Sequence, residues 1–412
     1  MQMFPRIVLF IVFLSCLNAS DGQQFALHDG DRVVFYGDSI TAQRLYTRFV
    51  EDFVLTRYPQ MHVDFSNAGI PGDTVYGGYT GDMETRVKRD LVPHQPTVVT
   101  IMLGMNDGYY MAFDPKYLKV FEDGYHQLLG AIQAAAPAAK ITLLSPTPYD
   151  EVTHGTEFAN YNATVGHYAA AVKGMALSSH LDFSDFDLAE TNLLNAAVPK
   201  EPSLAALLVP DRIHPAEASH WVMAATLARS WGMSPIVSSV TIDAAKVIPA
   251  HFENTLISDL GMKEGKLTWT QIDTALPLPL ALENAMIPFV LSISDLADMD
   301  KQMLRVDGLL AFRYKLAIDG HRIASFTQQE LSSGVNLALY PTPMEEQAKG
   351  VDGIELKRTR LDETRFLLDI EDPKVDPDGE GTKNLAAKDA ALALEQRKQA
   401  QPKPHRFQLS PE

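Results

Sequence analysis

Apolar residues in the first half of the chain alternate between short runs and longer stretches with helical spacing. A short, mainly apolar run is typical of a parallel strand that is buried on both faces of a sheet. We therefore predict buried parallel strands at Val33–Tyr36, Val63–Phe65, Val98–Leu103 and Ile141–Leu144.

The stretch between the first two runs has the spacing of an amphipathic helix. Leu45, Phe49 and Phe53 recur every four residues, so they lie on one face that can cover a sheet. Similar helices are expected at about 114–134, 157–177 and 216–231. Alternating strands and helices predict a parallel sheet covered on both faces, with ligand chemistry at the carboxyl ends of its strands.

The pattern changes near residue 236 to the alternation typical of strands, and Asp319–Gly320 predicts a hairpin turn there. Later segments are charged and rich in Pro, Gly and Ala. The sequence therefore predicts a first domain over residues 28–234, a β-rich module over 235–342, a helical segment over 343–370 that packs back on the first domain, and a linker with a low-complexity tail over 371–412.

The first 20 residues resemble a secretory signal peptide. One Arg precedes an apolar run, Ile7–Leu17, which is too short to span a bilayer, and small residues follow it. We expect cleavage after Ala19 or Ser20 and export to the periplasm or the medium, with no transmembrane segment. Cys16 is the only cysteine, so the mature protein would have no disulfide. Lipid anchoring through Cys16 is an alternative that Phe13 disfavours.

Composition places the chain among globular proteins and excludes one class of partner. It has 412 residues, of which 46% are hydrophobic and 21% charged. The formal net charge of −17 argues against a nucleic-acid partner, because phosphate binding needs clustered Lys and Arg.

A serine and a histidine are candidates for nucleophilic chemistry. Ser39 follows the first predicted strand, where a Gly-Asp-Ser run is also ordinary turn chemistry. Asp211 lies three residues before His214, so one turn of chain can bring its carboxylate to Nδ1 and leave Nε2 to face Ser39. Acyl transfer by serine needs such a base and such an acid. A structural role for any single histidine remains the alternative.

Two loops rich in glycine end neighbouring strands and can supply hydrogen-bond donors. Gly69 follows the second strand and can bring its backbone N–H close to a ligand. Asn106 follows the third strand and can offer a neutral side-chain N–H. Each loop taken alone is compatible with a plain βα turn.

Four ordered blocks together resemble the GDSL, or SGNH, hydrolase family. They are Gly37–Ile40, Asn67–Gly69, Gly104–Asp107 and Asp211–His214, and the resemblance covers roughly residues 30–232. The first block has Ile40 at the position of the Leu in the family name, and this replacement removes no catalytic group.

The resemblance implies a flavodoxin-like three-layer α/β/α sandwich, the SGNH hydrolase fold, here with an appended β-rich module. It implies that Ser39 is the nucleophile, that His214 is the general base and then the general acid, and that Asp211 orients His214. The backbone N–H groups of Ser39 and Gly69 and the side chain of Asn106 would form the oxyanion hole. The family implies no cofactor and no metal.

Weaker candidates lie beside the expected pocket. Asp73, Tyr76 and Tyr109 are candidates for substrate binding, although Asp73 is also suited to cap a helix. Asp38 and Asp107 are expected to hold loops through hydrogen bonds to backbone N–H groups rather than to touch substrate.

The sequence favours an exported serine esterase that removes acyl groups, most simply acetyl, from a carbohydrate. Its expected pocket loops carry Gly, Asp and Tyr, which suit a sugar better than a long acyl chain. A lipase or arylesterase acting on small acyl esters and a non-catalytic glycan-binding protein are the alternatives. The particular ester, the role of the β-rich module and the oligomeric state stay open.

Overall fold

The computed structural model describes residues 24–412 except 157–159, 367, 369 and 371–378. The predicted signal peptide over residues 1–20, including Cys16, lies outside the described residues, and so does the first part of the predicted linker. No helix among the described residues is long and apolar enough to cross a membrane.

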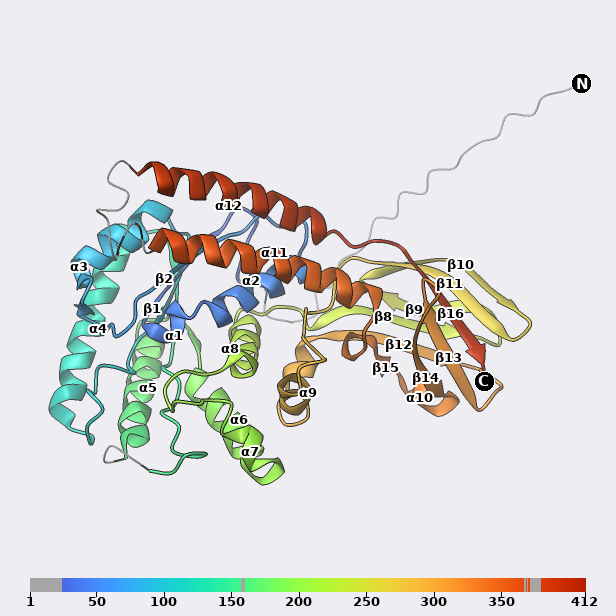
Figure 1. Cartoon of the computed structure of the whole chain (residues 1–412), viewed down its shortest axis with the longest axis horizontal. Helices are drawn as coiled ribbons and strands as arrows, with labels where there is room; N and C mark the ends of the chain where they lie inside the picture. Colours follow the sequence, from blue (N-terminus) through green and yellow to red (C-terminus); the bar gives the residue numbers. More distant parts are fainter. Residues whose placement is uncertain (1–23, 157–159, 367, 369, 371–378) are drawn as a thin grey trace, which may run out of the picture.

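A five-stranded parallel sheet forms the centre of the first domain, as predicted (Figure 1). The strand order is β2-β1-β5-β6-β7, the doubly wound order of flavodoxin-like folds. All four predicted strands belong to this sheet, and a fifth short strand, β7, was not expected. The strands are β1 (Arg32–Gly37), β2 (Asp64–Gly69), β5 (Val98–Met102), β6 (Lys140–Leu144) and β7 (Asp182–Ser184).

Helices cover both faces of the sheet because successive strand residues point to opposite sides. Val33 and Phe35 of β1 belong to one apolar core, in which Phe49 and Trp221 stack with ring centroids 3.9 Å apart. Val34 belongs to the opposite core. The first face is covered by α2 (Leu45–Arg57), α6 (Phe186–Lys200) and α8 (Glu217–Ser230), and the second by α4 (Pro115–Ala135) and α5 (Tyr161–Ser178).

Short elements complete this domain near the carboxyl ends of the strands. They are α1 (Ser39–Ala42), β3 (Gly77–Gly78), β4 (Gly81–Asp82), α3 (Met83–Arg86) and α7 (Pro202–Ala205).

The second half of the chain forms two β-sheets that enclose one apolar core. The predicted hairpin turn is confirmed, since Asp319 and Gly320 have φ angles of 51° and 80° and join two antiparallel strands. One sheet has the order β15-β12-β8-β9 and the other β10-β11-β16-β13-β14. The elements are β8 (Ile236–Asp243), β9 (Ile248–Glu253), β10 (Thr255–Lys263), β11 (Lys266–Asp273), α9 (Met286–Leu291), β12 (Lys301–Asp307), β13 (Arg313–Ile318), β14 (His321–Thr327), α10 (Gln328–Ser333), β15 (Val335–Asn336) and β16 (His405–Pro411).

Two long helices lie side by side and run from the β-sheets back over the first domain (Figure 1). These are α11 (Pro343–Phe366) and α12 (Glu380–Gln399). Arg358 of α11 donates from Nε to Asp389 of α12 at 2.8 Å and also contacts Glu51 of α2. The helical segment after residue 342 therefore packs on the first domain.

The expectation of a low-complexity tail was wrong for the end of the chain, because the residues after α12 form the strand β16. Strand β16 near the C-terminus lies in the middle of a sheet, paired with β11 and β13. Phe407 and Leu409 are buried, and Phe407 stacks on the equally buried Trp269 with ring centroids 5.0 Å apart. Trp269 is therefore a core residue, and the end of the chain completes the β-rich module.

Candidate active site

Ser39 is the first residue of the short helix α1, directly after β1. The Asp38 carboxylate caps this helix by accepting from the backbone N–H of Ile40 at 3.0 Å. Burial, opposed by the hydrogen bond from Ile40 and assisted by the charge of Asp107, raises the pKa of Asp38 to about 7. Asp107 in turn accepts from the N–H of Val75 at 3.0 Å. The two carboxyl groups hold loops, as predicted, and place Ser39 at the carboxyl edge of the sheet.

The structure brings Ser39, His214 and Asp211 into one hydrogen-bonded array. His214 Nε2 lies 2.8 Å from Ser39 Oγ, and His214 Nδ1 lies 2.6 Å from Asp211 Oδ2. Burial tends to raise the pKa of Asp211, but hydrogen bonds from the backbone and ring of His214 and from the backbone of Ile213 hold it below its ordinary value. Asp211 is thus kept as a carboxylate, which favours a proton on Nδ1 and a lone pair on Nε2.

Arg212 fixes the loop that carries this histidine, a role that the sequence did not reveal. Its backbone is left-handed, with φ of 72°. Its guanidinium donates to the carbonyls of His154 at 2.9 Å and Gly155 at 2.6 Å. The Arg212 carbonyl accepts from the N–H of Asp150 at 2.8 Å. The loop with Asp211 and His214 is therefore clamped to the loop after β6.

Asn106 is oriented by contacts at both ends of its amide. Nδ2 donates to the carbonyl of Asp73 at 2.9 Å, and the Tyr110 hydroxyl donates to Oδ1 at 3.1 Å. These bonds leave the second hydrogen of Nδ2 available to a ligand. Burial, followed by the charges of Asp38 and other groups, raises the pKa of Tyr110 to about 12, so its hydroxyl stays a donor.

Gly69 does not have the free backbone N–H that we expected. Its N–H donates to Asn67 Oδ1 at 3.0 Å. A Cβ at this position would overlap the backbone of Thr41 and Ala42, so glycine is required here for the close approach of β2 to α1. This contact, rather than an oxyanion hole, accounts for Gly69.

Gly72 has the properties that Gly69 lacks. It is the third residue of a β-turn closed by a bond from Asp73 N–H to the Ile70 carbonyl at 3.3 Å, with Pro71 second and a φ of 76° at Gly72. Among the described residues, no acceptor receives the Gly72 N–H, and a Cβ there would meet open space. Pro followed by Gly is the sequence signature of a type II β-turn, so this turn at Gly72 could have been predicted from the sequence.

The turn at Gly72 lies between the ends of two strands that carry the site. The N–H of Ile70 donates to the carbonyl of Gly37, one residue before Asp38, at 3.0 Å. On its other side, the Asp73 carbonyl receives the Asn106 amide. The turn is thereby held between the Ser39 and Asn106 loops.

The three weaker candidates differ in where the structure places them. Asp73 is fully buried and forms an ion pair with Arg86, so the expectations that it lines the pocket or caps a helix were wrong. Tyr76 is 40% exposed, and its hydroxyl donates to the Val120 carbonyl in α4 at 3.2 Å. Tyr109 is 60% exposed. Of the three, Tyr109 is the most accessible to a ligand.

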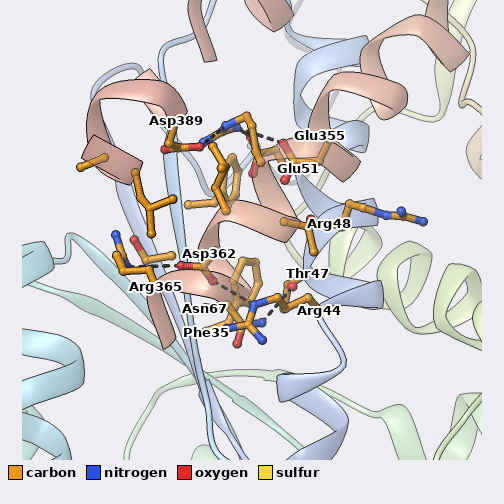
Figure 2. A pocket seen from close by; sticks show the side chains of 17 residues that line it. Phe35, Arg44, Thr47, Arg48, Glu51, Asn67, Glu355, Asp362, Arg365 and Asp389 are labelled. Atoms are coloured by element: carbon orange, nitrogen blue, oxygen red, sulfur yellow. Dashed lines mark hydrogen bonds and ion pairs between the residues drawn. The ribbon is translucent and has the colours of Figure 1, made fainter. Parts of the chain in front are cut away.

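A separate cavity lies beneath α11 and α12 (Figure 2). It has a volume of about 110 Å³, and its wall is charged: Arg44 pairs with Asp362, and Arg358 with Asp389. None of the described residues that line it belongs to the Ser39, His214 and Asp211 array. The described part of the chain also holds no group of three or more His, Cys, Asp or Glu side chains placed to bind a metal.

A doubly wound parallel sheet with a Ser, His and Asp array at its carboxyl edge defines the class of ester-bond hydrolases with a flavodoxin-like fold. Residues 35–222 match the model of the GDSL-like Lipase/Acylhydrolase family. This chain therefore contains a GDSL-like hydrolase domain, as the four sequence blocks indicated.

Similar proteins cover either the domain alone or nearly the whole chain. An acetylxylan esterase of Geobacillus stearothermophilus is 26% identical over 221 residues, which are 49% of this chain and 94% of that protein. Its crystal structure matches 51% of this chain and 97% of its own, with a TM-score of 0.41 and 26% identity. A gut microbial diltiazem-metabolizing enzyme matches 95% of this chain and 100% of its own, with a TM-score of 0.83 and 23% identity. The last comparison shows that the β-rich module belongs to a shared fold.

Proposed function

We propose that this protein is a serine esterase in which Ser39 is the nucleophile. The observation that carries the proposal is the unbroken contact from Ser39 Oγ through the His214 ring to Asp211, at 2.8 and 2.6 Å. Both distances lie within the range of good hydrogen bonds. This is the geometry that serine needs for activation by a base held by an acid.

In the first half of the reaction, Ser39 Oγ attacks the ester carbonyl carbon while its proton moves to His214 Nε2. The tetrahedral intermediate collapses, the bond to the alcohol breaks, and His214 returns the proton to the leaving oxygen. In the second half, water attacks the acyl-enzyme, gives a proton to His214 and releases the acid, and Ser39 regains its proton. Asp211 remains a carboxylate and stabilises the charged imidazole.

The oxyanion is bound by three neutral donors. They are the backbone N–H of Ser39, the second hydrogen of Asn106 Nδ2 and the backbone N–H of Gly72, which replaces Gly69 in this role. The support is that none of the three has an acceptor among the described residues. Donors that are already fixed and unpaired stabilise developing charge without reorganisation.

The substrate class is an acetylated carbohydrate. The GDSL-like domain is similar over almost the full length of an acetylxylan esterase, and the exposed Tyr109 ring is suited to stack on a sugar. Export remains part of the proposal and is supported by the signal-like sequence of the first 20 residues.

The test compares wild type with Ser39→Ala and, as a matched control, with Ser66→Ala. Ser66 lies in β2, and its hydroxyl contacts the ring of His94. We expect p-nitrophenyl acetate hydrolysis and acetate release from acetylated xylan to be lost in Ser39→Ala and retained in the control. Equal rates in wild type and Ser39→Ala would mean that the protein is a binder or acts through another residue. A preference for p-nitrophenyl octanoate over acetate would favour a lipase.

A further inference from the structure

A partly buried hydrogen-bond chain connects the helix of Ser39 to Pro215, the residue after His214. Gln43 lies one turn after Ser39, and its N–H donates to the Ser39 carbonyl at 2.9 Å. His220 in α8 is fully buried. Its Nε2 lies 3.1 Å from Gln43 Oε1, and Gln43 Nε2 lies 3.4 Å from the carbonyl of Pro215.

The direction of each bond follows from one fixed donor. The backbone N–H of Tyr46 points at His220 Nδ1 at 3.1 Å, so Nδ1 must accept and the single proton of a neutral imidazole must lie on Nε2. Nε2 then donates to Gln43 Oε1. This leaves the Gln43 amide N–H to donate to Pro215, and a flipped amide would set two donors against each other.

The surroundings of His220 keep it neutral and in place. Burial, opposed by the Pro215 carbonyl and assisted by the charges of His214 and Arg48, lowers the pKa of His220 to about 3. The ring lies parallel to that of Tyr46, with centroids 6.0 Å apart. The Tyr46 hydroxyl contacts Thr41 Oγ1 in α1 at 2.9 Å. Tyr46 therefore contacts both His220 and the helix of Ser39; we call the chain from His220 through Gln43 to Pro215 the relay.

We propose that Gln43 and His220 are positioning residues that set the distance between Ser39 and His214 by holding α1 against the Pro215 carbonyl. The proposal rests on the proposed function. The side chain of His214 is 32% exposed. Outside the array, its loop is held by the Arg212 guanidinium, by backbone hydrogen bonds and by the Gln43 amide. A displacement of about 1 Å between reacting groups can cost about a hundredfold in rate.

The sharpest test uses two amides that mimic different ring nitrogens. In His220→Gln, the side-chain amide N–H reaches the position of Nε2 and can still donate to Gln43. In His220→Asn, the shorter amide reaches only the position of Nδ1, and the bond to Gln43 is lost. We expect kcat for p-nitrophenyl acetate to fall about ten- to a hundredfold in His220→Asn, with KM within about twofold, and to be largely restored in His220→Gln.

A double-mutant cycle with Gln43→Met tests whether the two residues act as one unit. Gln43→Met and the double variant with His220→Asn should both lose the same factor as His220→Asn alone, because each breaks the same chain. The pH dependence of kcat/KM should have the same shape in all variants as in wild type, since His214 and Asp211 are unchanged. Thr226→Val, also in α8, is the control and should leave kcat unchanged.

Three outcomes would overturn the relay: kcat in His220→Asn within about twofold of wild type, equal losses in His220→Asn and His220→Gln, or multiplying losses in the double variant. Ser39→Ala is measured in the same assay. If Ser39→Ala keeps the activity, the proposed function itself fails, whereas an inactive Ser39→Ala beside unaffected His220 variants rejects only the relay.

Discussion

Replacing Asn106 with alanine removes one of the proposed oxyanion donors while leaving Ser39, His214 and Asp211 in place. The side chain makes two hydrogen bonds in the free protein, to the Asp73 carbonyl at 2.9 Å and from the Tyr110 hydroxyl at 3.1 Å. Neither bond involves the His214 array. The variant therefore separates the stabilisation of the oxyanion from the activation of the nucleophile.

The expected loss of activity follows from the number of donors. Removing one donor from an oxyanion hole costs about 3 to 4 kcal/mol, or about a hundred- to a thousandfold in kcat. Because the backbone N–H groups of Ser39 and Gly72 remain, we expect a loss near the lower end, with little change in KM. Losing two hydrogen bonds should lower the free energy of unfolding by about 1 kcal/mol each.

Tyr110→Phe is the matched variant, because it deletes only the hydroxyl that orients the Asn106 amide. Its kcat should fall less, by about tenfold, since the donor is still present but held by one bond. The assay is steady-state hydrolysis of p-nitrophenyl acetate, with thermal unfolding measured on the same samples. A kcat for Asn106→Ala within threefold of wild type, or a rise in KM alone, would refute the assignment of Asn106 as an oxyanion donor.

Three further predictions concern other parts of the chain. Asp52 is fully buried; burial, together with the nearby Asp352, raises its pKa well above the ordinary value. The folded state thus holds a proton that the unfolded state loses above a pH of about 4, so stability falls as pH rises; Asp52→Asn should remove this slope and melt higher than wild type at pH 8 but not at pH 4. Phe407→Ala should lower the free energy of unfolding in urea by about 3 to 5 kcal/mol, because it leaves a cavity beside Trp269. A decrease of less than about 0.5 kcal/mol would contradict the burial of β16 and favour a low-complexity tail. Tyr109→Ala should raise KM for acetylated xylo-oligosaccharides about tenfold, a loss of about 1.4 kcal/mol, without affecting p-nitrophenyl acetate, and equal effects on both would exclude a sugar platform.

Much of the fold and the pairing of Asp211 with His214 could be predicted from local sequence, whereas the part of Ser39 came from the resemblance of the four ordered blocks. The mainly apolar runs predicted four of the five strands because a parallel strand covered on both faces favours apolar residues on both sides. The Asp and His three residues apart can pair through their own loop, as Asp211 and His214 do at 2.6 Å. Short-range geometry decides both features, so neither needs knowledge of the rest of the chain.

The oxyanion donors depended on contacts between segments. Gly69 ends β2 and Gly72 lies in the turn that follows, and contacts made by the fold distinguish them: the Asn67 side chain occupies the Gly69 N–H, and α1 packs against Gly69, whereas Gly72 faces open space. Asp73 was equally ambiguous, because its carboxylate could cap a helix or face a ligand until Arg86 was found beside it. A polar group takes whichever partner the fold brings near, and local sequence does not contain that partner.

The end of the chain shows the same division on a larger scale. Phe407 and Leu409 alternate with polar residues, but the pattern is too short to stand apart from a charged, alanine-rich segment. Its two partner strands, β11 and β13, are far away in the sequence and supply both the hydrogen bonds and the apolar face. The sequence by itself predicted four strands of the parallel sheet and the helices α2, α4, α5 and α8, because these follow from local periodicity, but it missed β7 and α6. The catalytic candidates came from the four ordered blocks. Only the tertiary structure decided which donors stay free and where the last strand pairs, because these depend on groups brought together by folding.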